Sequence, residues 1–126
     1  MGPLINDIEA RRVASLVQGA EAQGAVRTGA SPSVAVTGAF HPPVVLAGVT
    51  AEMDIAHEEI FGPVAPVIRF HGEAEALRIA NDTQFGLAAY VYTADATRQW
   101  RLMERLEYGM VGVNDGLIAT EVAPFG

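Results

Sequence analysis

The stretch LAAYVYTADATRQWRLMERLEYGMVGV, residues 87–113, decides the fold class. Its apolar run at 87–92 is typical of a strand, and Asp95 then offers the side-chain acceptor that a helix N-terminus prefers. Gly109 suits the end of that helix, and residues 110–113 form a second apolar run. We expect the helix to bury a stripe made of Ala96, Trp100, Met103 and either Leu106 or one of its neighbours. A strand, a helix and a strand in this order indicate a right-handed crossover between parallel strands.

The N-terminal part of the chain predicts a longer helix followed by a short strand. Asn6 and Glu9 have the spacing of a capping box, so we expect a helix over about 7–23. Its apolar residues share one helical face: Val13, Leu16, Val17 and Ala20. A short strand is expected at 25–28. A loop should follow, because the next residues favour turns: Gly29, Ser31, Pro32 and Ser33.

The middle of the chain predicts two more strands and a short helix. Pro42 and Pro43 restrict a strand at 43–47 to a sheet edge or to a start just after the prolines. The strand expected at 64–70 alternates poorly, which favours burial of both its faces. A helix is expected at 73–81, with Leu77 and Ala80 inward. The whole pattern indicates an α/β fold with a largely parallel sheet and flanking helices.

Composition excludes several classes of partner. Eight Lys and Arg residues against fifteen Asp and Glu residues give a formal net charge of −7, the sign that nucleic acids and anionic membranes repel. Half of the residues are hydrophobic, which predicts a globular core, but no apolar run approaches the length of a membrane span. The first residues show no basic stretch before an apolar one, so we expect a cytoplasmic protein.

Candidate chemical groups are few. The sequence contains no cysteine, which excludes a disulfide, a thiolate metal site and a cysteine nucleophile within these residues. No G-x-G-x-x-G or G-x-x-x-x-G-K-[ST] fingerprint occurs. We also expect no metal site, because metal-ligand spacing is missing among the three histidines, His41, His57 and His71. Glu58 and Glu59 could divide acid and base roles, but adjacent side chains usually point apart, which favours a solvated polar cluster.

Segments spread over the whole chain resemble the aldehyde dehydrogenase superfamily. The central one, Glu58 to Val64, is similar to the family's E-x-F-G-P motif. The segments from Tyr108 to Gly116 and from Glu121 to Gly126 look most like succinate-semialdehyde dehydrogenases. The other matching segments, in order, are Gly2-Pro3-Leu4-Ile5, Pro42 to Leu46, Ala80 to Ala89, Gly109 to Asn114 and Ala123 to Gly126.

The resemblance implies that residues 1–126 are part of an aldehyde dehydrogenase catalytic domain. In that family a cysteine thiolate attacks the aldehyde, hydride passes to NAD or NADP, and a glutamate-activated water releases the acid. The cysteine, the general-base glutamate and the cofactor domain lie upstream of the matched segments, and the strand exchanged across the dimer interface lies downstream. We therefore expect a fragment of a semialdehyde-oxidising parent, with no catalytic residue, no activity alone and no tight cofactor binding.

The resemblance also assigns site residues. Glu59 matches the glutamate that hydrogen-bonds the nicotinamide ribose hydroxyls, and Phe61 matches the aromatic residue beside the nicotinamide. A carboxylate can accept two hydrogen bonds from a vicinal diol, and a ring two residues away can restrict the nicotinamide. Phe125 resembles a residue that lines the aldehyde tunnel. Ala119, beside Thr120, stands where succinate-semialdehyde dehydrogenases use a serine to hold the substrate carboxylate, so the aldehyde substrate stays open.

The sequence is also compatible with other interpretations. The chain is alternatively a non-catalytic interaction module or a gene remnant that retains the fold and self-associates through surfaces that missing segments normally cover. Weak binding of a nicotinamide through Glu59 and Phe61 is disfavoured, because few contacts would offset the entropy of association. Gly86 and Asn114 are expected to shape turns. The sequence does not decide between NAD and NADP, between natural and artificial truncation, or among oligomeric states.

Overall fold

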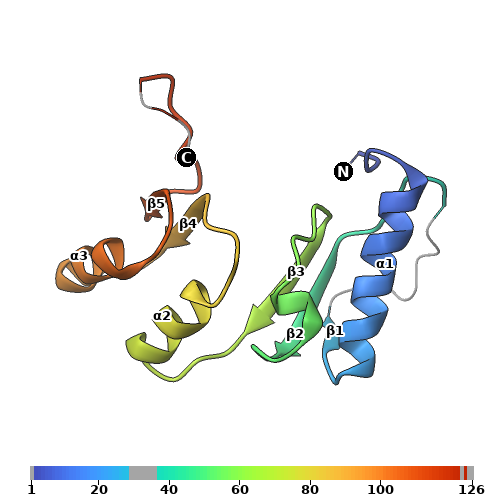
Figure 1. The fold of residues 1–126 in the computed structure, drawn as a ribbon, viewed down its shortest axis with the longest axis horizontal. Helices are drawn as coiled ribbons and strands as arrows, with labels where there is room; N and C mark the ends of the chain where they lie inside the picture. The colour runs from blue at the N-terminus through green and yellow to red at the C-terminus, as the bar shows by residue number, and fades with distance from the viewer. Residues whose placement is uncertain (1, 29–36, 123, 125–126) are drawn as a thin grey trace. The chain divides into compact units, whose positions relative to one another are not determined.

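The computed structural model describes residues 2–28, 37–122 and 124, so the loop expected from Gly29 to Ser33 lies outside the described residues. The chain divides into two compact units, residues 1–69 and 70–126, which are described separately (Figure 1). Each unit combines helices with a small sheet, which confirms the α/β class expected from the sequence. None of the helices in the described ranges is long and apolar enough to cross a membrane.

The first unit pairs a long helix with a small mixed sheet. Its strands have the order β1-β2-β3, with β1 antiparallel and β3 parallel to the central strand β2. In the parallel pair, Val44 lies opposite Val64. The elements of this unit are α1 (Asp7–Ala22), β1 (Val26–Thr28), β2 (Val44–Val49), the short 3-10 helix η1 (Asp54–Ala56) and β3 (Val64–Ile68).

Helix α1 begins where the sequence predicts it. The Asn6 side chain accepts a hydrogen bond from the backbone N–H of Glu9 at 2.8 Å, and this satisfies one of the donors that a helix start leaves unpaired. The buried face of α1 carries Ala10, Val13, Val17 and Ala20. The predicted stripe is thus confirmed, although Leu16 is only partly buried.

Strand β2 supplies the centre of the core of the first unit. Its side chains alternate, with Val44 and Leu46 buried and Val45 exposed. Leu46 packs in one cluster with residues from α1, from η1 and from the segment between β2 and η1, namely Val17, Ala20, Met53 and Ile55. The strand begins directly after Pro43, which confirms the predicted start; it is a central strand and not an edge strand.

The expectation that β3 is covered on both faces is wrong for this chain. The strand ends at Ile68, and alternate side chains, including Val67, are exposed. Only β2 pairs with it among the described strands, so β3 is an edge strand of its sheet. A weak alternation in the sequence therefore does not show that a second layer covers the strand in this chain.

The second unit contains the strand-helix-strand arrangement that residues 87–113 predict. Strands β4 and β5 are parallel, and Ala88 lies opposite Met110. They form a sheet separate from that of the first unit, so the described strands make two small sheets in place of the single sheet expected. The elements of this unit are α2 (Glu73–Asn81), β4 (Ala88–Val91), α3 (Ala96–Arg105) and β5 (Met110–Val113).

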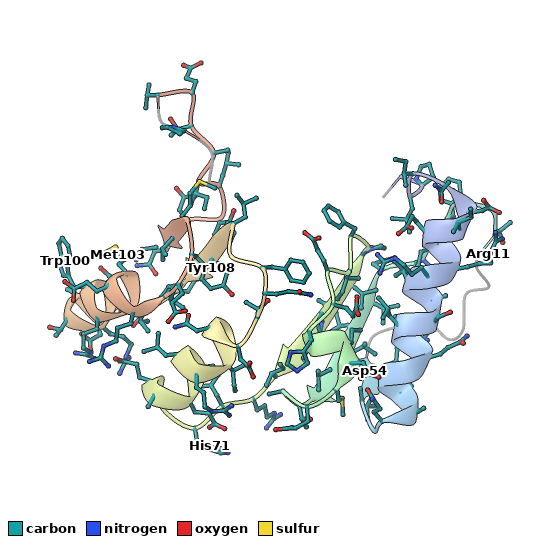
Figure 2. All side chains as sticks on the ribbon, viewed as in Figure 1. Arg11, Asp54, His71, Trp100, Met103 and Tyr108 are labelled. Atoms are coloured by element: carbon teal, nitrogen blue, oxygen red, sulfur yellow. The ribbon has the colours of Figure 1, made fainter. Side chains whose placement is uncertain are left out.

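The predicted buried stripe of α3 is wrong. No residue of α3 is buried, and the side chains of Trp100 and Met103 are 67% and 36% exposed. Figure 2 shows both side chains on the same side of α3, as the helical period predicts. The period therefore identifies an apolar face correctly. Ala96 is also exposed and Leu106 half-buried, because no described element of the second unit packs over this face closely enough to bury it.

Helix α3 is joined to α2 by a cluster of ion pairs. Both oxygens of Glu73 accept hydrogen bonds from Arg101, at 2.8 Å from Nε and 2.7 Å from Nη2, and Arg98 Nε adds a third at 3.2 Å. The hydrogen bonds from Arg101, followed by those from Arg98, lower the pKa of Glu73 from 4.5 to about 2. Because the charged form is favoured in the folded state, this cluster makes the contact between the helices depend on pH.

Acidification is expected to weaken the contact between α2 and α3. The pKa of Glu73 is lowered on folding, so its stabilising effect is complete above about pH 4.5 and is lost as the pH falls towards about 2. An NMR titration of the 126-residue chain should show the Arg101 signals moving in this range. Glu73→Gln should remove most of that movement, whereas Glu104→Gln, at another exposed position of α3, should preserve it. An unchanged acid response in Glu73→Gln would contradict the assignment.

Candidate functional site

The turn between η1 and β3 carries the two residues expected to face a cofactor. Glu59 is exposed, and the ring of Phe61 is 76% exposed. Phe61 has φ +44°, in the left-handed region that bulky residues rarely adopt. The turn is joined to β2 through a hydrogen bond from the Val44 N–H to the carbonyl of Pro63 at 2.8 Å. It therefore presents a carboxylate and an aromatic ring from a backbone tied to the sheet.

Helix α1 holds the opposite side of this turn. The Nη2 group of Arg12 donates to the carbonyl oxygens of Ile60, at 2.8 Å, and Glu59, at 3.3 Å. One residue further along α1, Val13 packs so closely on Gly62 that a Cβ at this glycine would lie 2.8 Å from Val13 Cγ2. Arg12 and Val13, two consecutive residues of α1, thus support the turn, and the contact with Val13 requires a residue without a side chain at position 62.

The carboxylates of Glu58 and Glu59 are both exposed, which agrees with a solvated pair. No described side chain forms a hydrogen bond or an ion pair with the Glu59 carboxylate, so its oxygens are free to accept hydrogen bonds from a ligand. The neighbouring His57 is instead engaged locally, because its Nε2 lies 2.6 Å from the carbonyl oxygen of Ala51. Among the described residues, no group of three or more potential ligands could hold a metal ion.

The predicted substrate-pocket residues lie in the second unit, after β5. Ala119 and Thr120 are both exposed, and the Thr120 hydroxyl accepts a hydrogen bond from the Val122 N–H at 3.5 Å. Phe125, the third predicted pocket residue, lies outside the described residues. The structure thus brings Glu59 and Phe61 together on one turn, and places Ala119 and Thr120 side by side in the chain of the other unit.

Of the two residues expected to shape turns, Asn114 lies at a bend directly after β5, whereas Gly86 pairs with the segment before β5. Asn114 has φ +55°, and its side chain accepts from the Thr93 N–H at 2.9 Å and donates to the Thr93 carbonyl at 3.0 Å. It therefore extends the pairing of β4 and β5 beyond the last strand residues. The carbonyl of Gly86 accepts a hydrogen bond from the Gly109 N–H at 2.8 Å, where the chain enters β4 and β5.

The contact made by Arg12 is not predicted by the sequence. A local signal exists, since Arg12 follows Glu9 at the spacing of a helical ion pair and the two side chains meet at 2.8 Å. Its more important partners lie 47 and 48 residues away in the chain. No periodicity or turn rule connects positions so far apart, so the sequence alone does not reveal the contact.

Comparison with known proteins identifies the family. A model described as "Aldehyde dehydrogenase family" matches residues 1–126. A succinate-semialdehyde dehydrogenase of Arabidopsis thaliana, named as mitochondrial, is 54% identical over 99% of this chain and 24% of its own length. A 3-sulfolactaldehyde dehydrogenase of Pseudomonas putida is 48% identical over 99% of this chain and 26% of its own length.

A solved structure confirms the fold. The crystal structure of succinate-semialdehyde dehydrogenase from Burkholderia pseudomallei matches with a TM-score of 0.93 and 52% identity, covering 100% of this chain and 26% of that one. The chain thus spans about a quarter of the length of the relatives it matches. With a family model matching over its full length, the chain belongs to the aldehyde dehydrogenase family.

Proposed function

We propose that residues 1–126 form the nicotinamide-facing part of the catalytic domain of an NAD(P)-dependent aldehyde dehydrogenase. The complete enzyme would oxidise a semialdehyde to the acid, with succinic semialdehyde as the first candidate because the relative of 54% identity carries that name. The observation that supports this proposal best is the turn at Glu59–Phe61, which presents an unpaired carboxylate and an exposed ring two residues apart.

The chemistry of this turn fits the nicotinamide half of the cofactor. Both oxygens of Glu59 are available to accept hydrogen bonds from adjacent ribose hydroxyls, and the exposed Phe61 ring offers an apolar surface beside them. The bound cofactor would supply the hydride acceptor. The role of this chain would be to bind the ribose and to limit the positions that the nicotinamide can take.

The residues expected to bind the aldehyde indicate the substrate less clearly than the turn at Glu59–Phe61 indicates the cofactor. Ala119 ends in a methyl group and cannot donate a hydrogen bond to a carboxylate, whereas the neighbouring Thr120 carries a hydroxyl. The relative acting on 3-sulfolactaldehyde, by its name, shows that similar sequences occur in dehydrogenases named for other substrates. Pocket roles for Ala119, Thr120 and Phe125 stay predictions, and the proposed cofactor is NAD or NADP.

The isolated chain would be inactive and would bind the cofactor only weakly, because it contains no cysteine to attack an aldehyde. A non-catalytic interaction module is the alternative, favoured by the large exposed apolar side chains of the second unit, such as Leu87, Tyr92 and Trp100. Self-association, the absence of nucleic-acid binding and a cytoplasmic location stay predictions. The Arabidopsis relative is named as mitochondrial.

In the complete enzyme, Glu59→Gln is expected to weaken NAD(P) binding about 10- to 100-fold, as loss of hydrogen bonds to a charged acceptor does. The dissociation constant can be measured by fluorescence titration with NADH and NADPH. Glu58→Gln is the matched control, because it removes a carboxylate that is also exposed and lies one residue away. Equal affinities of the wild type and Glu59→Gln would refute the proposed ribose contact.

A further inference from the structure

We propose that Arg12 is a positioning residue for the cofactor turn, holding the backbone from Glu59 to Phe61 in the shape that binds a nicotinamide ribose. The proposal rests on the proposed function of Glu59 and assigns no direct contact between Arg12 and the cofactor. It names a residue on α1 that lies 47 positions from the glutamate through which it would act.

The hydrogen bonds of Arg12 fix two successive peptide planes. Its Nη2 group lies 2.8 Å from the carbonyl oxygen of Ile60 and 3.3 Å from that of Glu59. These two carbonyls belong to the peptide units on either side of Ile60. Hydrogen bonds from a charged donor are stronger than those between neutral groups, so the guanidinium restricts rotation along the path from Glu59 to Phe61.

The guanidinium is itself oriented by α1. Arg12 Nε donates to Glu9 Oε2 at 2.8 Å, and the side chains of both residues are only about one-third exposed, at 35% and 34%. The N–H of Glu9 is in turn bonded to the Asn6 side chain, which caps the helix. A continuous series of contacts therefore leads from the start of α1 to the turn.

The turn needs such support because its backbone is strained. Phe61 has φ +44°, and a conformation of this kind in a bulky residue persists only where the surroundings hold it. Arg12 holds the residue before Phe61, and Val13 packs against Gly62, the residue after it. Lysine could not replace Arg12 fully, because a single ammonium group cannot occupy the positions of both Nε and Nη2.

The test is a double-mutant cycle in the complete enzyme, with NADH and NADPH as probes. Arg12→Ala is expected to raise the dissociation constant and the KM for the cofactor about tenfold, with kcat at saturating cofactor changed by about twofold at most. Since Arg12 acts through Glu59, adding Arg12→Ala to Glu59→Gln should weaken binding little further. The proposal would be overturned if Arg12→Ala bound the cofactor with wild-type affinity. It would also be overturned if the double variant raised the dissociation constant by the product of the two single increases.

Amide hydrogen exchange, measured without cofactor, tests independently whether Arg12 stabilises the turn. Arg12→Ala should speed amide exchange in residues 58–62, with little change in β2, whereas Arg11→Ala should change neither segment. Arg11 is the matched control, because its side chain is 66% exposed and pairs with Asp7 within the same helix. Unchanged exchange in residues 58–62 of Arg12→Ala would also overturn the proposal.

Two further comparisons keep the test decisive. Should Arg12→Ala fail to fold, Glu9→Gln keeps the guanidinium but weakens its orientation, and about a twofold to threefold loss of cofactor affinity is expected; no loss would contradict the inference. If Glu59→Gln binds NADH and NADPH as the wild type does, the proposed function fails. If Glu59→Gln weakens binding and the Arg12 variants do not, only the positioning role fails.

Discussion

Replacing Leu46 by alanine is expected to lower the free energy of unfolding of the first unit by about 2–5 kcal/mol. Leu46 is 0% exposed and lies on the central strand of its sheet. Its side chain packs against α1, η1 and the segment between β2 and η1, in the cluster that contains Val17 and Ile55. Alanine would remove three carbon atoms and leave a cavity that these partners could fill only in part.

The matched control for this prediction is Val45→Ala. Val45 is the preceding residue of β2, points to the opposite face and is 42% exposed, so its truncation should cost much less. Amide exchange of β2 in the 126-residue chain can measure both changes, since tryptophan fluorescence reports only on Trp100 in the second unit. Comparable losses in the two variants would show that β2 does not face the core as described.

Gly62→Ala is expected to destabilise the first unit by about 1–3 kcal/mol, the usual cost of forcing extra volume into a tight contact. The added Cβ would lie 2.8 Å from Val13 Cγ2 and 3.0 Å from Val13 Cγ1. Val13 is fully buried and β-branched, so it has little freedom to turn away. The clash should push the turn away from α1 and disturb Phe61 with it.

A second substitution tests the cause of that loss. Val13→Ala removes both methyl groups that the new Cβ would meet, so the double variant should be more stable than the sum of the single effects predicts. Thermal unfolding of the four proteins measures this coupling. Additive effects would mean that the contact between Gly62 and Val13 does not limit the residue at position 62.

The sequence predicts well those features that neighbouring residues determine. The start of α1 depends on Asn6 and Glu9, and the start of α3 depends on Asp95, whose side chain accepts from the Arg98 N–H at 3.0 Å. The succession of β4, α3 and β5 follows from apolar periods and one glycine within residues 87–113. These rules act over a few residues, so the element order and the fold class can be deduced without knowledge of the tertiary packing.

Burial and long-range contacts are predicted less well. Trp100 and Val67 have the right spacing for buried positions but remain exposed, because the period of a helix or strand does not say what covers its apolar face. Phe61 illustrates a second limit, since nothing in its own identity predicts a left-handed backbone. Its conformation is supported from α1, through residues distant in the sequence.

Physical rules alone predict only part of the candidate site, and the family resemblance is needed for the rest. From the residues alone, Glu58 and Glu59 are a solvated pair ahead of a turn, and the structure agrees that both are exposed. Only the resemblance selects Glu59 over Glu58 and relates it to Phe61. The geometry adds that the Glu59 carboxylate has no partner among the described residues and that Arg12 holds the backbone on which it stands.

The most direct test of the proposed function is the oxidation of succinic semialdehyde, followed by the reduction of NAD or NADP. It should be measured in parallel for the complete polypeptide that contains residues 1–126 and for the 126-residue chain. We expect cofactor reduction by the complete polypeptide and none by the isolated chain, which has no cysteine. Turnover by the isolated chain, or failure of the complete polypeptide to oxidise any aldehyde with either cofactor, would contradict this account.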